Sequence, residues 1–369
     1  MVTGAQSESG LGLPIKVRSS ACDFVERRRE EFYPKSDTLL TDGELRGLGS
    51  LTRQMSLGQA RVALESCGIQ ASSVVALDDT GTFHALFACV DTGQQKWVLK
   101  VNRISDRLVD FPFEAEFSVS TLLEEQGIPH AKVIAVDLSR AAVPFDFVVM
   151  EFADGRSFRS FDAQEDEVML HLPALARYLR KCHDIAGTGF GLLSSDSANG
   201  GTLAGLHTRW WDYLGVQLDR HIRLVAQAGL VTTGEARDIR RVFSELETMP
   251  SPEKTRLLHG DCGPHNAILT ANGGISMIDW EDALAGDPLF EVAMWATFNP
   301  TRRWGTFFDS YFSSAWKPDS LFWIYFLRIS LAKAVVRLRF GYKDVPGRPL
   351  ASTRIQQSLD ALSPARRTR

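Results

Sequence analysis

Hydrophobic and polar positions follow two different periods along the chain, and the first half reads mainly as β-structure. Helices are expected over residues 22–31 and 51–67, before the period shortens. Short β-rich runs then follow, separated by turn residues, at 74–77, 85–90, 96–101, 132–136 and 145–152. One further helix is expected over 113–125, between the third and fourth runs. Together these segments predict a five-stranded antiparallel sheet with one helix.

The second half of the chain returns to helical spacing. Helices are predicted over 165–184, 207–228 and 234–247, and again from Pro288 to about Leu362. One hairpin interrupts them, because two apolar runs at 266–270 and 275–279 flank Asn272-Gly273, a tight-turn signal.

These patterns predict an α+β fold with a small β-rich lobe followed by a larger helical lobe. The boundary falls near Phe152–Gly155. We therefore divide the chain into an N-terminal extension (1–50), an N-terminal lobe (51–152) and a C-terminal lobe (153–369).

Composition narrows the class of protein. The formal charge of −4 argues against a nucleic-acid binder, which needs a concentrated basic surface. The five cysteines are scattered and lack metal-ligand spacing, which favours a reducing compartment. The most apolar helix, Leu321–Val336, is interrupted by Arg328 and Lys333, so it is expected in the core rather than in a membrane. No signal peptide is evident at the N-terminus, and we expect a cytoplasmic monomer or homodimer without membrane partners.

A polar loop precedes the hairpin and carries the strongest chemical signal. It contains His259-Gly260-Asp261 and, five positions after Asp261, Asn266; Asp279 ends the second strand. A two-stranded ribbon brings Asp261, Asn266 and Asp279 to one end. Phosphoryl transfer needs a carboxylate to accept the hydroxyl proton, and a carboxylate with an amide oxygen to hold Mg²⁺ against the phosphates. The spacing therefore favours a phosphotransferase.

The motifs around this loop resemble those of the aminoglycoside phosphotransferase and choline kinase family. The resemblance is carried by His259–Asn266, Ile278–Glu281 and Gly286–Pro288. It covers about residues 70–340, and the first 50 residues have no counterpart in it. It implies a protein-kinase-like two-lobe fold, Mg²⁺, and ATP or GTP as phosphoryl donor.

By this resemblance, Asp261 is the catalytic base, and Asn266 and Asp279 are the metal ligands. His259 is expected to shape the loop by hydrogen bonds to backbone. Asp287 is expected to cap the helix that starts at Pro288.

The resemblance also assigns the nucleotide half. Lys100 lies among apolar strand residues and would contact the α- and β-phosphates. Glu116 is its expected partner, with Glu114 as the alternative, and a partly buried ammonium in this position would neutralise phosphate charge.

Two backbone segments complete the expected nucleotide site. Thr80, Gly81 and Thr82 fall where a loop should cover the phosphates, although a single glycine fits an ordinary hairpin turn equally well. Glu151 and Phe152 resemble the hinge between the lobes, whose backbone would read the purine edge. Backbone recognition leaves ATP and GTP both open.

The acceptor is expected to be a small polar molecule. Only six residues separate Asp279 from Gly286, whereas protein kinases use a longer segment as a platform for peptides. Part of the chain resembles the hygromycin B phosphotransferases, in the segments Val98–Asn102, Gly187–Gly191, Trp211–Tyr213, Gly286–Asp287 and Phe290–Ala293. We therefore expect an aminoglycoside-like or nucleoside antibiotic.

Acidic and aromatic side chains of the second half are the candidates for binding this acceptor: Asp212, Glu281, Asp282, His265 and Trp211. Acids would bind amino groups, and an indole would stack on a sugar face. Two alternatives stay open. One is a metabolic kinase for a sugar, choline-like or amino-alcohol substrate; the other is a nucleotide-binding pseudokinase scaffold, against which the complete trio of Asp261, Asn266 and Asp279 argues.

Overall fold

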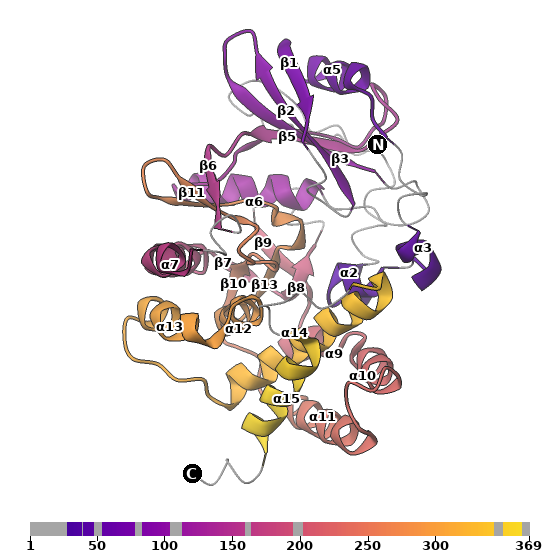
Figure 1. The fold of residues 1–369 in the computed structure, drawn as a ribbon, viewed down its shortest axis with the longest axis vertical. Coiled ribbons are helices and arrows are strands. Elements are labelled where there is room, and N and C mark those ends of the chain that lie inside the picture. The colour runs from indigo at the N-terminus through magenta and orange to yellow at the C-terminus, as the bar shows by residue number, and fades with distance from the viewer. Residues whose placement is uncertain are drawn as a thin grey trace.

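A five-stranded antiparallel sheet forms the N-terminal lobe of the computed structural model, as predicted (Figure 1). The structure describes residues 28–38, 40–47, 54–77, 83–103, 113–158, 164–194, 202–342 and 350–363. The strands lie in the order β1-β2-β3-β5-β4, and their bounds are β1 (Ala71–Ala76), β2 (His84–Asp91), β3 (Lys96–Asn102), β4 (Val133–Asp137) and β5 (Phe147–Glu151).

Two helices flank this sheet. Helix α5 (Leu57–Ser66) begins after Ser56, which forms a capping box with Gln59, so the helix is shorter than the predicted 51–67. It packs on one face of the sheet through a cluster that includes Leu64 and Leu99. Helix α6 (Phe113–Glu125) has the predicted bounds and lies between the sheet and the C-terminal lobe (Figure 1).

The C-terminal lobe contains the predicted hairpin, β11 (Ala267–Thr270) and β12 (Ile275–Met277), which β6 (Gly155–Ser157) extends to three strands. It also contains a small closed barrel that the sequence pattern did not predict. The barrel strands are β7 (Ala186–Thr188), β8 (Phe190–Leu193), β9 (Leu203–His207), β10 (Thr255–Leu258) and β13 (Leu284–Gly286).

Helices surround these strands. The segment predicted as one helix over 207–228 is two, because Gln217 adopts a left-handed conformation with φ 56° between them. The helices are α7 (Glu165–Cys182), α9 (Trp210–Gly215), α10 (Leu218–Gln227), α11 (Thr233–Leu246), α12 (Pro288–Phe298), α13 (Trp304–Phe312), α14 (Ser320–Phe340) and α15 (Ala351–Leu362), with 3₁₀ turns η3 (Trp280–Asp282) and η4 (Thr301–Arg303).

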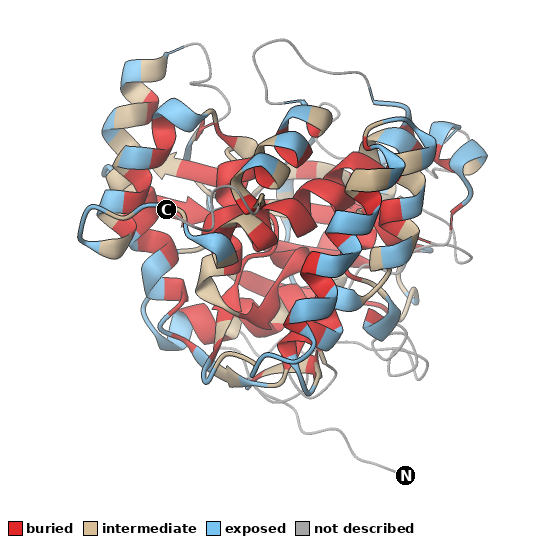
Figure 2. Ribbon diagram, turned by 90° about the horizontal axis from the view of Figure 1, so that it is seen from below, coloured by how far each residue is buried: buried red, intermediate tan, exposed pale blue. Residues whose placement is uncertain are grey.

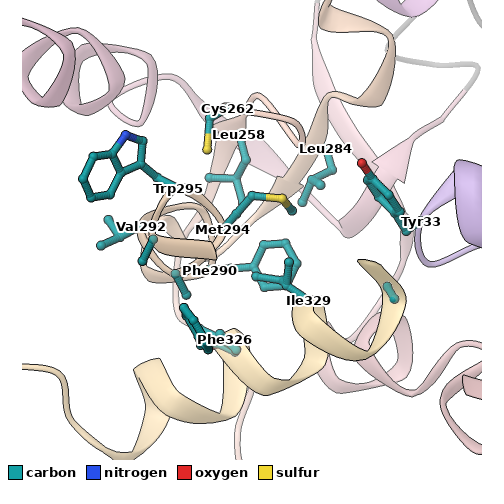
Figure 3. Close-up of a cluster of buried hydrophobic side chains, with 14 of the residues drawn as sticks. Tyr33, Leu258, Cys262, Leu284, Phe290, Val292, Met294, Trp295, Phe326 and Ile329 are labelled. Carbon is teal, nitrogen blue, oxygen red and sulfur yellow. The ribbon is translucent and has the colours of Figure 1, made fainter. Parts of the chain in front are cut away.

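Buried residues concentrate in the interior of the molecule (Figure 2), and most of those in this lobe belong to one hydrophobic cluster. Helix α12 is almost entirely buried, and its Phe290 and Trp295 pack in a cluster with α14 and the barrel strands (Figure 3). Arg328 and Lys333 of α14 are buried as well, in agreement with the expected core position of this helix. Among the described helices, none has the length and hydrophobicity that crossing a membrane requires.

The described residues 28–38 and 40–46, named here the N-terminal arm, run along the C-terminal lobe. They form η1 (Arg28–Glu30), α2 (Pro34–Asp37) and α3 (Asp42–Arg46). Only the end of the helix predicted over 22–31 lies within the described residues, and it is this 3₁₀ turn. Phe32 lies 5.1 Å from Tyr213 and 6.0 Å from Phe290, measured between ring centroids.

Asp37 fixes the middle of the arm. Its carboxylate accepts hydrogen bonds from the backbone amides of Phe32 and Tyr33 (both 3.0 Å) and from His221 Nε2 (2.7 Å), and Arg220 lies 3.2 Å away. Burial by itself would raise the pKa of Asp37, but the His221 and backbone hydrogen bonds lower it below 3.8. Folding therefore favours the ionised form.

We expect Asp37→Ala to lower the free energy of unfolding by about 3 kcal/mol, because it leaves buried donors without an acceptor. The stabilising contribution of Asp37 is present above about pH 4 and is lost as the pH falls below that value, so the loss should shrink in acid. Urea unfolding at pH 7 and at pH 3 measures both effects. Asp42→Ala, which removes an exposed carboxylate bonded to Arg339, is the control and should cost less than about 1 kcal/mol. Equal losses for both variants would contradict the anchoring role.

Candidate active site

The loop between β10 and β11 is held in shape by buried hydrogen bonds. Glu291 of α12 accepts the backbone amides of His259 (3.0 Å) and Gly260 (2.9 Å), and it also contacts His183 Nε2 (2.9 Å). The Asp261 amide lies 3.2 Å from His259 Nδ1, while His259 Nε2 lies 2.9 Å from the Ile278 carbonyl. Burial lowers the pKa of His259, which keeps it neutral. Among the described residues, both hydrogen bonds of the His259 ring are thus with backbone groups, as expected.

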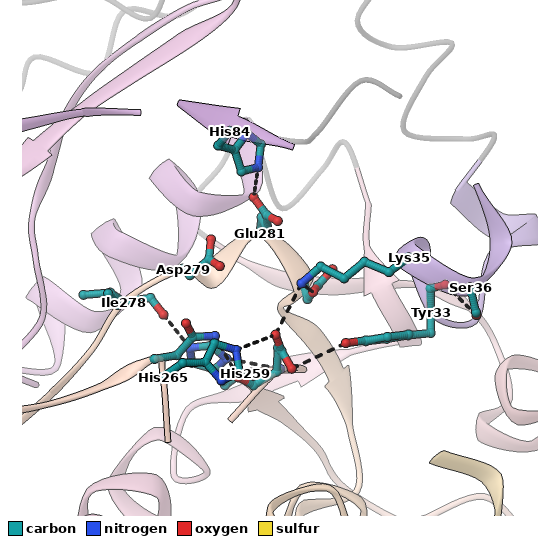
Figure 4. Close-up of polar contacts among 12 residues, drawn as sticks. Tyr33, Lys35, Ser36, His84, His259, His265, Ile278, Asp279 and Glu281 are labelled. Carbon is teal, nitrogen blue, oxygen red and sulfur yellow. Dashed lines mark hydrogen bonds and ion pairs between the residues drawn. The ribbon is translucent and has the colours of Figure 1, made fainter. Parts of the chain in front are cut away.

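Asp261 is buried, and the side chains of Tyr33, Lys35 and His265, labelled in Figure 4, converge on its carboxylate. His265 Nε2 is 3.3 Å from its carboxylate, Lys35 Nζ is 3.4 Å away, and the Tyr33 hydroxyl donates across 3.4 Å. Burial alone would raise the pKa of Asp261, but Lys35 and the His265 hydrogen bond hold it well below its usual range. The carboxyl is therefore ionised and able to accept a proton.

Lys100 of β3 joins the two lobes through a second set of carboxylates. Its Nζ lies 3.1 Å from Glu116 of α6, 2.5 Å from Asp279 and 2.7 Å from Glu281. Burial would lower the pKa of Lys100, but these carboxylates raise it well above its usual value, so the ammonium stays charged. The predicted Lys100–Glu116 pair is thus present, and Glu114 is not needed for it. His84 Nε2 also contacts Glu281, at 2.6 Å.

Carboxylates outnumber ammonium groups in this region. Lys35 and Lys100 face five of them: Glu116, Asp261, Asp279, Glu281 and Asp282. Burial is the main reason why the pKa values of Glu116 and Asp282 rise to about 7. Asp282 Oδ1 is buried and has no hydrogen-bond partner among the described residues. The excess of negative charge suits a cation bound with the nucleotide.

Asn266 and Asp279 fit the donor set for Mg²⁺. The Asn266 side-chain amide donates to the Asp261 carbonyl (2.9 Å), which leaves its oxygen to face a ligand, and Asp279 is partly exposed at the end of the hairpin. In the described part of the chain, no group of three or more His, Cys, Asp or Glu side chains is arranged to hold a metal by itself.

Of the two backbone segments predicted to bind the nucleotide, the structure describes only the hinge at Glu151 and Phe152. Thr80, Gly81 and Thr82 lie outside the described residues. The amides of Glu151 and Phe152 donate to the carbonyls of Lys132 (2.8 Å) and Lys96 (3.2 Å). A purine at this hinge would therefore have to use carbonyl groups here or the amide of a following residue.

The predicted acceptor residues fall into two groups. His265, Glu281 and Asp282 belong to the cluster, although Glu281 contacts Lys100 and His84 on the nucleotide side. Trp211 is buried, donates to the Pro250 carbonyl (3.1 Å) and stacks on Tyr325; this burial contradicts its predicted role as a surface for a sugar.

Asp212 is also separate from the cluster. It is exposed on α9 and pairs with Arg209 at 3.5 Å, so its predicted role gains no support. Conversely, Tyr33, Lys35 and His84 were not predicted. The first two lie in the segment without a recognisable motif, and no spacing in the sequence relates them to Asp261.

The two lobes and the carboxylate cluster between them define a kinase-like phosphotransferase architecture. Residues 81–321, more than half of the chain, match the model of the phosphotransferase enzyme family known as APH. The chain belongs to this family.

Individual relatives agree with this family. Hygromycin-B 4-O-kinase of Escherichia coli is 26% identical over 209 residues, which are 55% of this chain and 56% of that protein. The fold resembles that of a thermostable mutant of aminoglycoside phosphotransferase APH(4)-Ia in ternary complex with AMP-PNP and hygromycin B (TM-score 0.56, 22% identity, 82% and 96% of the two chains). It also resembles a choline/ethanolamine kinase family protein from Mesorhizobium loti (TM-score 0.54, 18% identity, 84% and 95%).

We expect Gly260→Ala to lower the free energy of unfolding by about 3 kcal/mol. Gly260 has φ 79°, and an added Cβ would lie 1.8 Å from the Asp282 carbonyl oxygen. Gly273→Ala is the matched control, because Gly273 has φ 78° but no atom within 4 Å of the added carbon, and it should cost about 1 kcal/mol. Thermal and urea unfolding measure both, and similar losses would show that packing against Asp282 is unimportant.

Proposed function

We propose that this protein transfers the γ-phosphoryl group of ATP or GTP to a hydroxyl of a small polar molecule. The observation that carries the proposal is the convergence of Asp261, Asn266, Asp279 and Lys100 at the junction of the two lobes. The family match supports the same reaction class.

Each residue of the cluster has a distinct part in the proposed reaction. Asp261 orients the acceptor hydroxyl and accepts its proton as the oxygen attacks phosphorus. Lys100, kept charged by its carboxylate neighbours, binds phosphate oxygens of the nucleotide. Asn266 and Asp279 would hold Mg²⁺, which supplies neutralisation of the charge on the β- and γ-phosphates. No covalent enzyme intermediate is required.

An antibiotic is the proposed acceptor, either aminoglycoside-like or a sugar-containing nucleoside. The E. coli relative, whose name specifies hygromycin B, supports this class. The unpaired buried oxygen of Asp282 supports an acceptor that donates hydrogen bonds from hydroxyl or ammonium groups. Hygromycin B is the first compound to test, because both a curated relative and a structural neighbour act on it or bind it by name.

The experiment is incubation of the purified protein with MgATP or MgGTP and a panel of acceptors, followed by mass spectrometry for an added phosphate. The panel contains hygromycin B, other aminoglycosides, nucleoside antibiotics, choline, ethanolamine and simple sugars. Phosphorylation of an antibiotic supports the proposal. If only choline, ethanolamine or simple sugars were phosphorylated, the protein would be a metabolic kinase and the antibiotic acceptor would be wrong. If the protein bound nucleotide but phosphorylated nothing, the result would support a pseudokinase scaffold.

Asp261→Asn should lower kcat by roughly 10²–10⁴-fold, with the Kd for MgAMP-PNP within a few-fold of wild type, because the amide cannot accept the hydroxyl proton. Steady-state kinetics and calorimetry measure these quantities. Asp238→Asn is the control, since Asp238 is exposed on α11 and pairs with Arg241. Near-normal turnover of Asp261→Asn would refute the role of Asp261 as base.

Asp279→Asn should act on nucleotide binding instead. It removes a charge that faces both Lys100 and the proposed metal, so the Kd for AMP-PNP should rise at least about tenfold in the presence of Mg²⁺. Without Mg²⁺ the difference from wild type should be much smaller. Calorimetric titration under both conditions measures this, and an equal effect with and without Mg²⁺ would exclude Asp279 as a metal ligand.

A further inference from the structure

The N-terminal arm is a fixed part of the C-terminal lobe. Besides the Asp37 contacts, Arg339 of α14 donates to the carbonyls of Ser36 (2.8 Å) and Thr38 (3.0 Å), and Tyr213 donates to the carbonyl of Phe32 (2.7 Å). The guanidinium of Arg328 lies 3.4 Å from the centre of the Phe32 ring. These buried contacts come from three different helices, so the short helix α2 has one position relative to the loop between β10 and β11.

This anchoring brings two arm side chains to Asp261. The Tyr33 ring packs at the edge of the central hydrophobic cluster (Figure 3), and its hydroxyl donates to Asp261 Oδ1 across 3.4 Å. Lys35 extends from the short helix α2 toward Asp261, and its Nζ lies 3.4 Å from Asp261 Oδ2 and 3.5 Å from Asp282 Oδ2 (Figure 4). Burial would lower the pKa of Lys35, but Asp261 and Asp282 raise it well above its usual value, so its ammonium is charged.

The position of this charge relates directly to the reaction. A hydroxyl that gives its proton to Asp261 must lie within about 3 Å of that carboxylate, and its oxygen must approach phosphorus to about 3–3.5 Å before bond formation. The transferred group therefore passes within a few ångströms of Asp261, where Lys35 also lies. Lys100 contacts a different set of carboxylates: Glu116, Asp279 and Glu281.

We infer that Lys35 is a catalytic residue whose ammonium binds the γ-phosphoryl group during transfer, and that Tyr33 positions Asp261. In this step the acceptor oxygen forms a bond to phosphorus and its proton goes to Asp261. The bond from phosphorus to the bridging oxygen breaks, and its electron pair leaves on the nucleoside diphosphate. Lys35 gives up no proton; it neutralises charge on the transferred phosphoryl oxygens. The inference rests on the proposed phosphoryl transfer and adds the arm to its active site.

The test compares Lys35→Met, Lys35→Arg and a control, Lys181→Met, which changes an exposed lysine on α7. Hydrolysis of MgATP is measured with water as the acceptor, so the assay does not depend on the antibiotic. Transfer to hygromycin B is measured in parallel. For Lys35→Met we expect kcat to fall about 10²-fold, with the KM for MgATP within about threefold of wild type. Lys35→Arg should recover part of the loss, and Lys181→Met should equal wild type.

A binding measurement separates catalysis from a structural role. MgADP with aluminium fluoride mimics the transition state of phosphoryl transfer, whereas MgAMP-PNP mimics bound MgATP. Lys35→Met should weaken binding of the first by about the factor lost in kcat and leave the second within threefold. Equal affinities for the fluoride complex in Lys35→Met and wild type would overturn the inference, as would an unchanged kcat. A rise in kcat would instead make the arm inhibitory.

A second variant covers the case in which Lys35→Met folds poorly. Lys35→Cys is assayed before and after alkylation with 2-bromoethylamine, which restores an ammonium at nearly the same reach, and treated wild type is the control. Recovery of at least tenfold in kcat supports the inference, and complete alkylation without recovery contradicts it.

Tyr33→Phe should lower kcat less than Lys35→Met does. If the wild-type protein transferred phosphate neither to water nor to any acceptor, both the proposed function and this inference would fail; an active wild type with an unaffected Lys35→Met refutes the inference alone.

Discussion

The burial of Lys100 among three carboxylates is the constraint on which the arrangement of the two lobes depends. Lys100 comes from the N-terminal sheet and Glu116 from α6, whereas Asp279 and Glu281 come from the end of the C-terminal hairpin. A buried ammonium without partners would be strongly unfavourable, and so would the carboxylates without it. Lys100 therefore pairs with the carboxylates of Asp279 and Glu281 only when the two lobes are in this arrangement. The same contact holds Asp279, the proposed metal ligand, 2.5 Å from Lys100, the proposed phosphate-binding ammonium.

The N-terminal arm supplies a second connection between the lobes. Leu40 and Leu45 pack with Phe83 of the N-terminal lobe and Phe340 of α14 in one hydrophobic cluster. Asp37 and Arg339 hold the preceding turn through buried hydrogen bonds. The proposed active site is consequently built from three parts: the sheet, the loop between β10 and β11 with its hairpin, and the arm. The arm places the ammonium of Lys35 beside Asp261, the proposed base.

Several of these features were readable from the sequence for physical reasons. Short β-rich runs between turn residues predicted the strands of the first sheet. Gly127 and Pro129 marked the end of the helix over 113–125, and Asn272-Gly273 predicted the hairpin that places Asp279. Local patterns were sufficient there, because each element has a face that must be buried. The motif residues were predictable as a group because a polar loop between two apolar strands has few geometries available.

Other features depend on contacts between distant residues and left no local signal. The barrel strands are three to five residues long, which is too short for a hydrophobic period to distinguish them from helix. The break before α10 results from the left-handed conformation of Gln217. Glutamine rarely adopts this conformation, so the sequence does not predict the break. Trp211 was predicted to line the acceptor pocket, but it is buried. An aromatic residue type alone does not distinguish a core position from a pocket position. The arm has no motif at all; its role follows from Asp37, His221 and Arg339, which are far apart in sequence.

The central claim is that the cluster around Asp261 and Lys100 is the place where phosphate is transferred. A crystal structure of the full chain with MgAMP-PNP tests it most directly. The account predicts Mg²⁺ on Asn266 and Asp279, Lys100 on the α- and β-phosphates, and the γ-phosphorus within about 6 Å of the Asp261 carboxylate, leaving room for one acceptor oxygen. A nucleotide bound outside this junction, or a γ-phosphate more than about 8 Å from Asp261 in the closed complex, would contradict it.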